Sequence, residues 1–354
     1  MARVLKGRGA VSSPKARFDA HHGEPVDDGW YAEPLPDSVA TRVLPEPART
    51  VITRNASPDI GFSQSINPYR GCEHGCIYCY ARPSHAYVGL SPGLDFETKL
   101  FYKAQAAARL IEELSRPGYV PRTIMLGANT DPYQPLEKRL RVTRSILEVL
   151  DKCHHPVTIV TKGALIERDL DILAPMARQN LVSVMVSLTT LDPELKRRLE
   201  PRAASPLARL AAIRRLHAAG VPVGALIAPV IPALTDHELE RLLEAAADAG
   251  ARCAGYVVLR LPHELKDLFR EWLATHYPER ARHVLSRIHS IRDGRDNDPA
   301  FGSRMRGSGV DAALLERRFE RATRRLGLDR RMGVALDSSR FERPRAGPQL
   351  ELGL

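Results

Sequence analysis

The 354-residue sequence lacks an apolar run long enough to cross a bilayer, and residues 1–6 lack the apolar core of a secretory signal peptide. These two absences favour a cytoplasmic protein with no membrane partner, in which thiols stay reduced. No glycine-rich dinucleotide or P-loop fingerprint follows any of the apolar segments either. That third absence argues against a doubly wound nucleotide-binding sheet, which we keep as the second choice of fold.

Cysteine is also scarce, with five residues in the chain. Cys153 and Cys253 stand alone, and we interpret both as small buried hydrophobic residues. The other three form a single C-x3-C-x2-C motif, made by Cys72, Cys76 and Cys79. Ferredoxin-type clusters take four thiolates. Three thiolates therefore suit an iron–sulfur cluster in which one iron stays free to bind something other than protein.

A zinc site is the main alternative for these cysteines, with His74 or His85 as the fourth ligand. Zinc ligands usually come as two pairs far apart in the sequence, and no second C-x2-C pair exists here. Gly71 and Gly75 allow the loop to curl until all three sulfurs face one point, because glycine tolerates the required backbone angles. The cluster is thus the preferred interpretation, and both histidines are expected to hydrogen-bond within the loop.

The motif resembles the cluster motif of the radical S-adenosylmethionine (radical SAM) enzymes, including an aromatic residue, Tyr78, before the last cysteine. The runs at 65–72 and 79–83 are similar to the spore photoproduct lyase-like branch, and the resemblance covers about residues 60–300. It implies SAM as one cofactor and a 4Fe–4S cluster held by the three cysteines as the other. The implied chemistry is reductive cleavage of SAM to a 5′-deoxyadenosyl radical, which abstracts hydrogen from a substrate.

The centre of the chain alternates between apolar and amphipathic segments. Continuous apolar runs predict six strands, at 65–69, 123–127, 157–161, 181–187, 221–227 and 253–259. Helical periodicity predicts helices at 101–114, 136–150, 170–176, 206–219 and 238–249. Such β/α units imply a parallel sheet covered by helices on one face. Together with the resemblance they indicate an α/β fold, a partial (β/α)6 TIM-like barrel of the radical SAM type over residues 61–300.

The two ends of the chain differ from this core in composition. Residues 1–60 show no sustained periodicity, which predicts an irregular N-terminal extension with a short strand at 51–53. Residues 6–10 are predicted to be a flexible basic segment, a tail by preference, with contact to a phosphate backbone as the alternative. Residues 301–354 form an arginine-rich C-terminal extension, in which 310–326 have the periodicity of an amphipathic helix.

In α/β barrels the active site is built at the carboxyl ends of the strands, and polar residues follow several predicted strands here. By the resemblance, Thr130 and Ser187 would hydrogen-bond the methionine or ribose part of SAM. Lys162 would pair with its carboxylate, while Tyr78 and Ala228 would contact the adenine through backbone groups. The alternatives are that Lys162 caps a carbonyl and that the two hydroxyls hold turns together.

One departure from the lyase pattern concerns hydrogen return. The lyase has a cysteine on the loop after the second strand, where this sequence has Ala128. Tyr80, beside the last cluster cysteine, is kept and is the candidate catalytic residue. Cys253 opens the sixth predicted strand and should therefore lie at the opposite rim. The cofactor-binding residues thus match the family, whereas repair of spore photoproduct itself is not expected.

The charge of the chain bears on its substrate. From Arg304 to Arg345, twelve arginines face six acidic residues, which gives +6 of the net charge of +10. Positive charge favours polyanionic partners, so damaged DNA or another nucleic acid is one candidate substrate, contacted through the 310–326 helix. A charged, solvated helix face packed across the barrel is the alternative. A nucleotide, peptide or other small substrate is equally open, as is a non-catalytic iron–sulfur module.

Two protein partners are also expected. The resemblance implies an electron donor of the flavodoxin or ferredoxin type. The last six residues, Gln349–Leu354, resemble the bacterial sliding-clamp-binding peptide, and extended terminal peptides suit docking into a groove.

Overall fold

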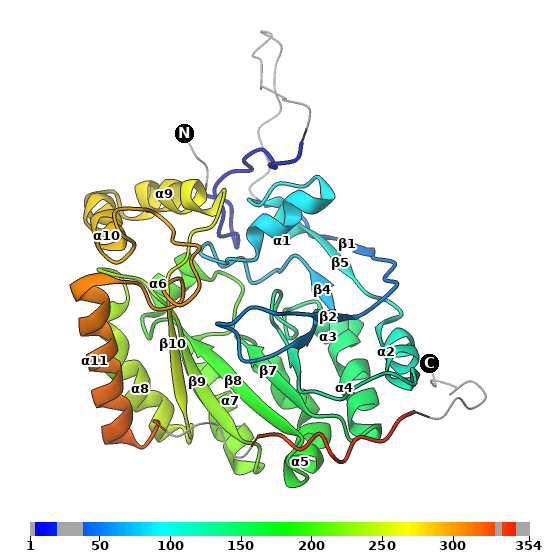
Figure 1. Ribbon diagram of the computed structural model, residues 1–354. Helices are drawn as coiled ribbons and strands as arrows, with labels where there is room; N and C mark the ends of the chain where they lie inside the picture. The colour runs from blue at the N-terminus through cyan, green and yellow to red at the C-terminus, as the bar shows by residue number, and fades with distance from the viewer. Residues whose placement is uncertain (1–3, 20–37, 330–334, 345–354) are drawn as a thin grey trace, which may run out of the picture.

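The computed structural model describes residues 4–19, 38–329 and 335–344 (Figure 1). The main sheet of this part has seven strands in the order β10-β9-β8-β7-β6-β3-β2. The edge strand β2 (Ile52–Arg54) is antiparallel to its neighbour. The other six are parallel: β3 (Gln64–Ile66), β6 (Ile124–Leu126), β7 (Val157–Thr161), β8 (Val182–Leu188), β9 (Val223–Val230) and β10 (Ala254–Val258). All six predicted strands are confirmed, and the fold is the predicted open, partial (β/α)6 barrel.

Five helices cover the outer face of this sheet (Figure 1). They bury apolar side chains in the main hydrophobic core and correspond to the five predicted helices: α2 (Ala106–Ser115), α4 (Val142–Lys152), α5 (Leu170–Arg178), α7 (Pro206–Ala218) and α8 (Leu239–Asp248). The fourth of them ends before Gly220, whose φ of 78° is a backbone angle that favours glycine. Shorter elements connect the units: α1 (Asp95–Thr98), α6 (Pro193–Leu199), η1 (Arg82–Val88), η2 (Ala164–Asp169) and η3 (Asp236–Glu238).

The start of the first predicted helix is wrong by five residues. Lys99–Tyr102 forms a strand, β5, in a second sheet with β1 (Arg42–Pro45) and β4 (Tyr69–Arg70). β1 lies in the part of the N-terminal extension that was expected to be irregular, whereas β2 confirms the short strand expected at 51–53. Tertiary pairing with a distant segment therefore decides the conformation of residues 99–102.

The single helix predicted at 136–150 is also wrong, because the structure has two. Arg141, at φ 53°, separates α3 (Glu137–Leu140) from α4. The buried Glu137 carboxylate accepts hydrogen bonds from the amides of Thr143, at 2.9 Å, and Arg144, at 3.2 Å. Glu137 thus satisfies donors that the first turn of α4 leaves unpaired, and this stabilises the break.

Two helices beyond the last strand were not predicted, α9 (Leu265–His276) and α10 (Pro278–Ser290). They form a second hydrophobic core with the cysteine loop and α6. Trp272 is fully buried in that core, and its indole nitrogen donates to the carbonyl of Arg198 at 3.1 Å. These helices therefore support the cysteine loop from the side away from the sheet.

The C-terminal helix is confirmed as α11 (Gly309–Leu326), which packs on α8 (Figure 1). Two of its arginines pair with carboxylates of α8: Arg318 with Glu240 at 2.7 Å, and Arg325 with Glu244 at 2.5 Å. These contacts are those of a charged face packed across the barrel. The Gln349–Leu354 peptide lies outside the described residues. None of the described helices is long and apolar enough to span a membrane.

Phe319 of α11 contacts Tyr256 of β10 with a ring-centroid distance of 4.6 Å, and only 8% of its surface is exposed. We expect Phe319→Ala to lower the free energy of unfolding by about 3 kcal/mol, since it leaves a cavity between the helix and the sheet. Leu314→Ala on the same helix is the control, because Leu314 is 53% exposed and should change stability by less than about 0.5 kcal/mol. Urea denaturation of both variants measures this, and equal losses would contradict the packing described.

Candidate active site

The three motif cysteines line one cavity of ≈ 580 Å³ at the carboxyl ends of the parallel strands. Cys72 and Cys76 are buried, and Cys79 is half-buried. Polar side chains from strand ends line the same cavity, as do apolar residues that include Ile60, Phe62, Met125, Val160, Met185 and Leu226. A pocket of this size and lining suits organic ligands of the size of a cofactor or nucleotide.

The loop that carries the cysteines is held from inside by Arg82, which has no exposed surface. Its guanidinium donates to the carbonyl oxygens of Cys76, at 2.8 Å, and Gly75, at 3.1 Å. It also pairs with the fully buried Glu97 at 2.5 Å. The curl of the loop is therefore fixed by backbone carbonyls that converge on one cation, with Gly75 at φ 67°.

The segment around Arg8 completes this arrangement and corrects the prediction of a flexible tail at residues 6–10. Glu97 accepts hydrogen bonds from the amides of Gly9, at 2.9 Å, and Ala10, at 2.8 Å. Arg8 is buried and donates to the carbonyl of Glu97 at 2.9 Å. A Cβ at Gly9 would lie 1.8 Å from the carbonyl oxygen of Gly75, so only glycine fits there. Gly9 and Ala10 are buried where their amides supply donors that the carboxylate needs.

Three thiols in one cavity are donors of the kind that a 4Fe–4S cluster takes. No group of three or more Cys, His, Asp or Glu side chains within the described ranges lies close enough together to ligate one ion. In a 4Fe–4S cluster each thiolate binds a different iron, so its ligands can stand further apart. Burial raises the pKa of all three thiols, and a bound cationic centre would favour their thiolate forms.

Both histidines act as hydrogen-bonding residues, as expected. The His74 Nδ1 atom lies 3.4 Å from the Asp131 carboxylate, and the His85 Nε2 atom lies 2.9 Å from the carbonyl oxygen of Lys99. Burial lowers the pKa of His85 to about 4, which keeps that ring neutral at pH 7.

Four of the five residues predicted to contact SAM line the cavity: Tyr78, Lys162, Ser187 and Ala228. The Lys162 Nζ atom donates to the carbonyl oxygen of Ala228 at 3.2 Å and lies 5.8 Å from the centre of the Tyr78 ring. Lys162 forms no ion pair with a carboxylate in the described part of the chain. Its charge therefore remains available to a ligand, even though it also meets a carbonyl as the alternative interpretation required.

Thr130 is the residue that the structure does not bring to the cavity. Its side chain is 2% exposed, and its hydroxyl donates to the carbonyl of Tyr69 at 2.7 Å. The alternative role, a hydroxyl that holds the loop in place, describes Thr130 better than direct contact with a cofactor. The reason is that the loop after β6 turns Thr130 toward β4, away from the cavity.

A charged network lies beneath Tyr78. The Tyr78 hydroxyl donates to Glu200, which also pairs with the buried Arg209. The Thr189 hydroxyl lies 2.9 Å from Glu200 and 3.0 Å from the carbonyl oxygen of Ala228, within hydrogen-bond reach of both acceptors. Burial alone would raise the pKa of Glu200, but Arg209 and Lys162 outweigh it and hold that pKa at about 2. Glu200 is thus an anion that fixes the aromatic residue of the cysteine motif.

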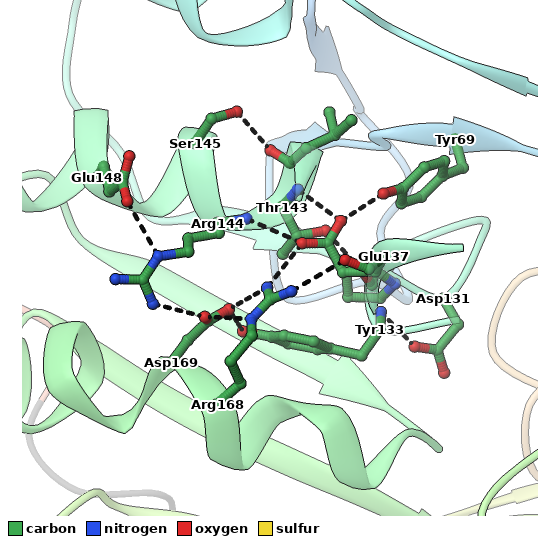
Figure 2. Close-up of polar contacts among 12 residues, drawn as sticks. Tyr69, Asp131, Tyr133, Glu137, Thr143, Arg144, Ser145, Glu148, Arg168 and Asp169 are labelled. Carbon is green, nitrogen blue, oxygen red and sulfur yellow. Dashed lines mark hydrogen bonds and ion pairs between the residues drawn. The ribbon is translucent and has the colours of Figure 1, made fainter. Parts of the chain in front are cut away.

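Asp131 orders the loops around the cavity. Its carboxylate accepts from the Lys162 amide at 2.7 Å and from the Thr161 hydroxyl at 2.6 Å. Burial favours a higher pKa for Asp131, but His74 and these donors lower it to about 2. Behind this loop, Figure 2 shows Arg168 between Glu137, at 2.8 Å, and Asp169, at 2.7 Å.

Tyr80 forms part of the cavity wall with about half of its surface exposed. Its hydroxyl donates to the carbonyl oxygen of Ala128. The guanidinium carbon of Arg260 lies 5.8 Å from the centre of its ring. Arg260 was not predicted, although its place two residues after β10 follows the rule that strand ends carry site residues. The Cys253 sulfur lies before β10, 3.9 Å from that of Met185, and does not line the cavity.

Comparison with known proteins places these observations in a family. A model described as "Radical SAM superfamily" matches residues 66–246. An uncharacterised protein of Mycobacterium tuberculosis is 44% identical over 220 residues, which cover 62% of this chain and 65% of that protein. One of Methanocaldococcus jannaschii is 28% identical over 183 residues, covering 50% and 64%. The matched region therefore spans just under two thirds of the length of these curated relatives.

Among solved structures, spore photoproduct lyase complexed with dinucleoside spore photoproduct is similar, with a TM-score of 0.57 and 16% identity. The match covers 80% of this chain and 79% of the lyase chain. At this identity the similarity shows a shared fold.

We expect Glu97→Gln to lower the free energy of unfolding by about 3–5 kcal/mol, because it leaves the buried Arg82 without its counter-charge. Glu112→Gln is the control: Glu112 is 56% exposed and pairs with Arg109 at the surface, so its loss should cost less than about 1 kcal/mol. Denaturant unfolding of the metal-free proteins measures both effects. If the two variants are equally stable, the ion pair does not hold the loop.

Proposed function

The chain belongs to the radical SAM superfamily, and from this membership we propose that it is an enzyme with a 4Fe–4S cluster and SAM as cofactors. The observation that carries the proposal is the shared cavity, which brings three thiols and an unpaired lysine together at the carboxyl ends of the parallel strands. When bound, the cofactors supply an electron and a 5′-deoxyadenosyl radical that takes a hydrogen atom from the substrate.

Each cavity residue has a separate role in this proposal. Cys72, Cys76 and Cys79 hold the cluster and leave one iron to SAM. Lys162 binds the SAM carboxylate and Ser187 its methionine or ribose hydroxyl groups, while backbone groups of Tyr78 and Ala228 contact the adenine. Thr130 acts through the loop that it holds. The apolar walls exclude water from the reacting atoms, which protects a radical from side reactions.

The substrate is proposed at the level of class. The structurally similar lyase is complexed with a dinucleoside lesion, and the basic C-terminal region adds positive charge, so nucleic acid is the first candidate. A nucleotide or another small molecule is the second, because the cavity itself has the volume of a small-molecule site. Transfer of deuterium into 5′-deoxyadenosine from labelled DNA or from free nucleotides distinguishes the two. A flavodoxin or ferredoxin is the proposed reductant.

Anaerobic reconstitution tests the cluster. We expect the wild-type protein to bind about four irons per chain and, with dithionite, to convert SAM to 5′-deoxyadenosine. Alanine substitution of Cys72, Cys76 or Cys79 should abolish both, whereas Cys153→Ala and Cys253→Ala should change neither. Iron analysis and chromatography of the products give the result. Bound zinc in place of iron would overturn the proposal, and iron without SAM cleavage would leave a non-catalytic module.

Lys162→Met tests the carboxylate contact. Removal of one charge-assisted hydrogen bond should weaken SAM binding about 10- to 100-fold, with the iron content unchanged. Lys152→Met is the control, since Lys152 is exposed at the end of α4. Equilibrium dialysis with labelled SAM measures the affinities. Equal affinity in the wild type and Lys162→Met would remove Lys162 from the binding site.

A further inference from the structure

We propose that Arg260 anchors an anionic group of the substrate, a carboxylate or a phosphate, at the wall of the cavity formed by the end of β10. This inference rests on the proposed function, because it assigns a ligand to the same cavity. Arg260 is the one arginine that lines the cavity in the described part of the chain. No role follows for it from the cluster or from SAM.

The guanidinium of Arg260 lacks the partners that a partly buried cation needs. Its Nη1 atom lies 3.7 Å from the Met305 sulfur, a weak acceptor, and its buried Nε atom has no hydrogen-bond partner within the described ranges. It forms no ion pair with any carboxylate of the described residues, and its remaining contact is the face of the Tyr80 ring. A cation removed from water without a counter-charge is costly. The structure therefore retains a charge whose partner is not part of the fold.

Two arginines near Arg260, Arg292 and Arg304, have structural roles because protein oxygen atoms bind their guanidinium groups. Arg292 donates to the carbonyl oxygens of Leu259, at 2.7 Å, and Val258, at 3.2 Å, and thereby holds the end of β10. Arg304 pairs with Asp59 at 2.6 Å. Arg260 makes neither kind of contact. Burial and the nearby Arg304 lower its pKa, the direction expected for a cation short of negative charge.

Lys162 and Arg260 lie at different strand ends of the cavity, and one of these two cations is enough for SAM. SAM carries one carboxylate, and Lys162, after β7, is already placed to bind it. β10 is three strands further along the sheet than β7. Arg260, after β10, is therefore placed to bind an anionic group other than the SAM carboxylate. The two carboxylates that line the cavity are already paired, Asp59 with Arg304 and Asp131 with His74.

The surroundings of Arg260 indicate the rest of the ligand. Ile60, Phe62, Val257 and Met305 line the cavity together with the Tyr80 ring. An apolar or aromatic body therefore suits this wall, with one anionic group at the guanidinium. Carboxylates and phosphates both match the two-pronged geometry of arginine, so either is a suitable anion.

Isothermal titration calorimetry with two pairs of probes tests the proposal. Thymidine 5′-phosphate against thymidine represents the phosphate source, and phenylacetate against phenylacetamide represents the carboxylate source. We expect the charged member of one pair to bind the wild type at least about tenfold more tightly than its neutral partner. Arg260→Gln should abolish this preference without changing the affinity of the neutral member. Arg324→Gln, at a side chain that is 69% exposed on α11, is the control for overall charge.

The pair that shows the preference identifies the source of the anion. Thermal unfolding adds a second measurement: Arg260→Gln should be as stable as the wild type or more so, because the cation has no partner to lose. A preference that survives in Arg260→Gln, no preference in either pair, or clear destabilisation of this variant would each overturn the proposal. Measurements are made on cluster-free and reconstituted protein. Failure to build a cluster contradicts the proposed function, whereas loss of the charge preference contradicts the role of Arg260 alone.

Discussion

The buried ion pair between Arg82 and Glu97 is the interaction on which the cysteine loop depends. Arg82 gathers the carbonyls of Gly75 and Cys76, and Glu97 gathers the amides of Gly9 and Ala10. Neither charge would be tolerated alone in a site without water. Because both are satisfied, the cysteine loop and a distant N-terminal segment share one buried support.

The anionic side chains at this cavity are paired within the protein, whereas two of its cationic side chains form no ion pair within the described ranges. The anions Glu200 and Asp131 are saturated by donors from the protein, and both pKa values are held at about 2. Two cations, Lys162 and Arg260, form no ion pair with a carboxylate of the described residues. A site that neutralises its own anions and leaves cations free is prepared for ligands with negative groups. The carboxylate of SAM is one such group, and the substrate is inferred to bring another.

The sequence predicted the elements whose signal is local. Continuous apolar runs gave the six parallel strands, and the cysteine spacing gave the residues that meet in the cavity. Prediction from the sequence failed where a specific side-chain or strand-pairing contact decides the local conformation. Glu137 stabilises the break at Arg141, pairing with β1 makes residues 99–102 a strand, and the Glu97 carboxylate holds the buried amides of Gly9 and Ala10. Thr130 shows the same limit, since hydroxyl chemistry predicts a contact but not the direction in which the loop turns it.

By the resemblance, Ala128 stands where the lyase branch has its hydrogen-donating cysteine, so the proposed reaction would need another donor at this cavity. Apart from the three motif cysteines, no thiol lines the cavity within the described residues, and Cys253 lies beyond it beside Met185. Two phenols remain. Tyr78 is buried and hydrogen-bonded to Glu200, whereas Tyr80 faces the cavity with its hydroxyl on the Ala128 carbonyl. If the protein itself returns a hydrogen atom, Tyr80 is therefore the side chain positioned to give it.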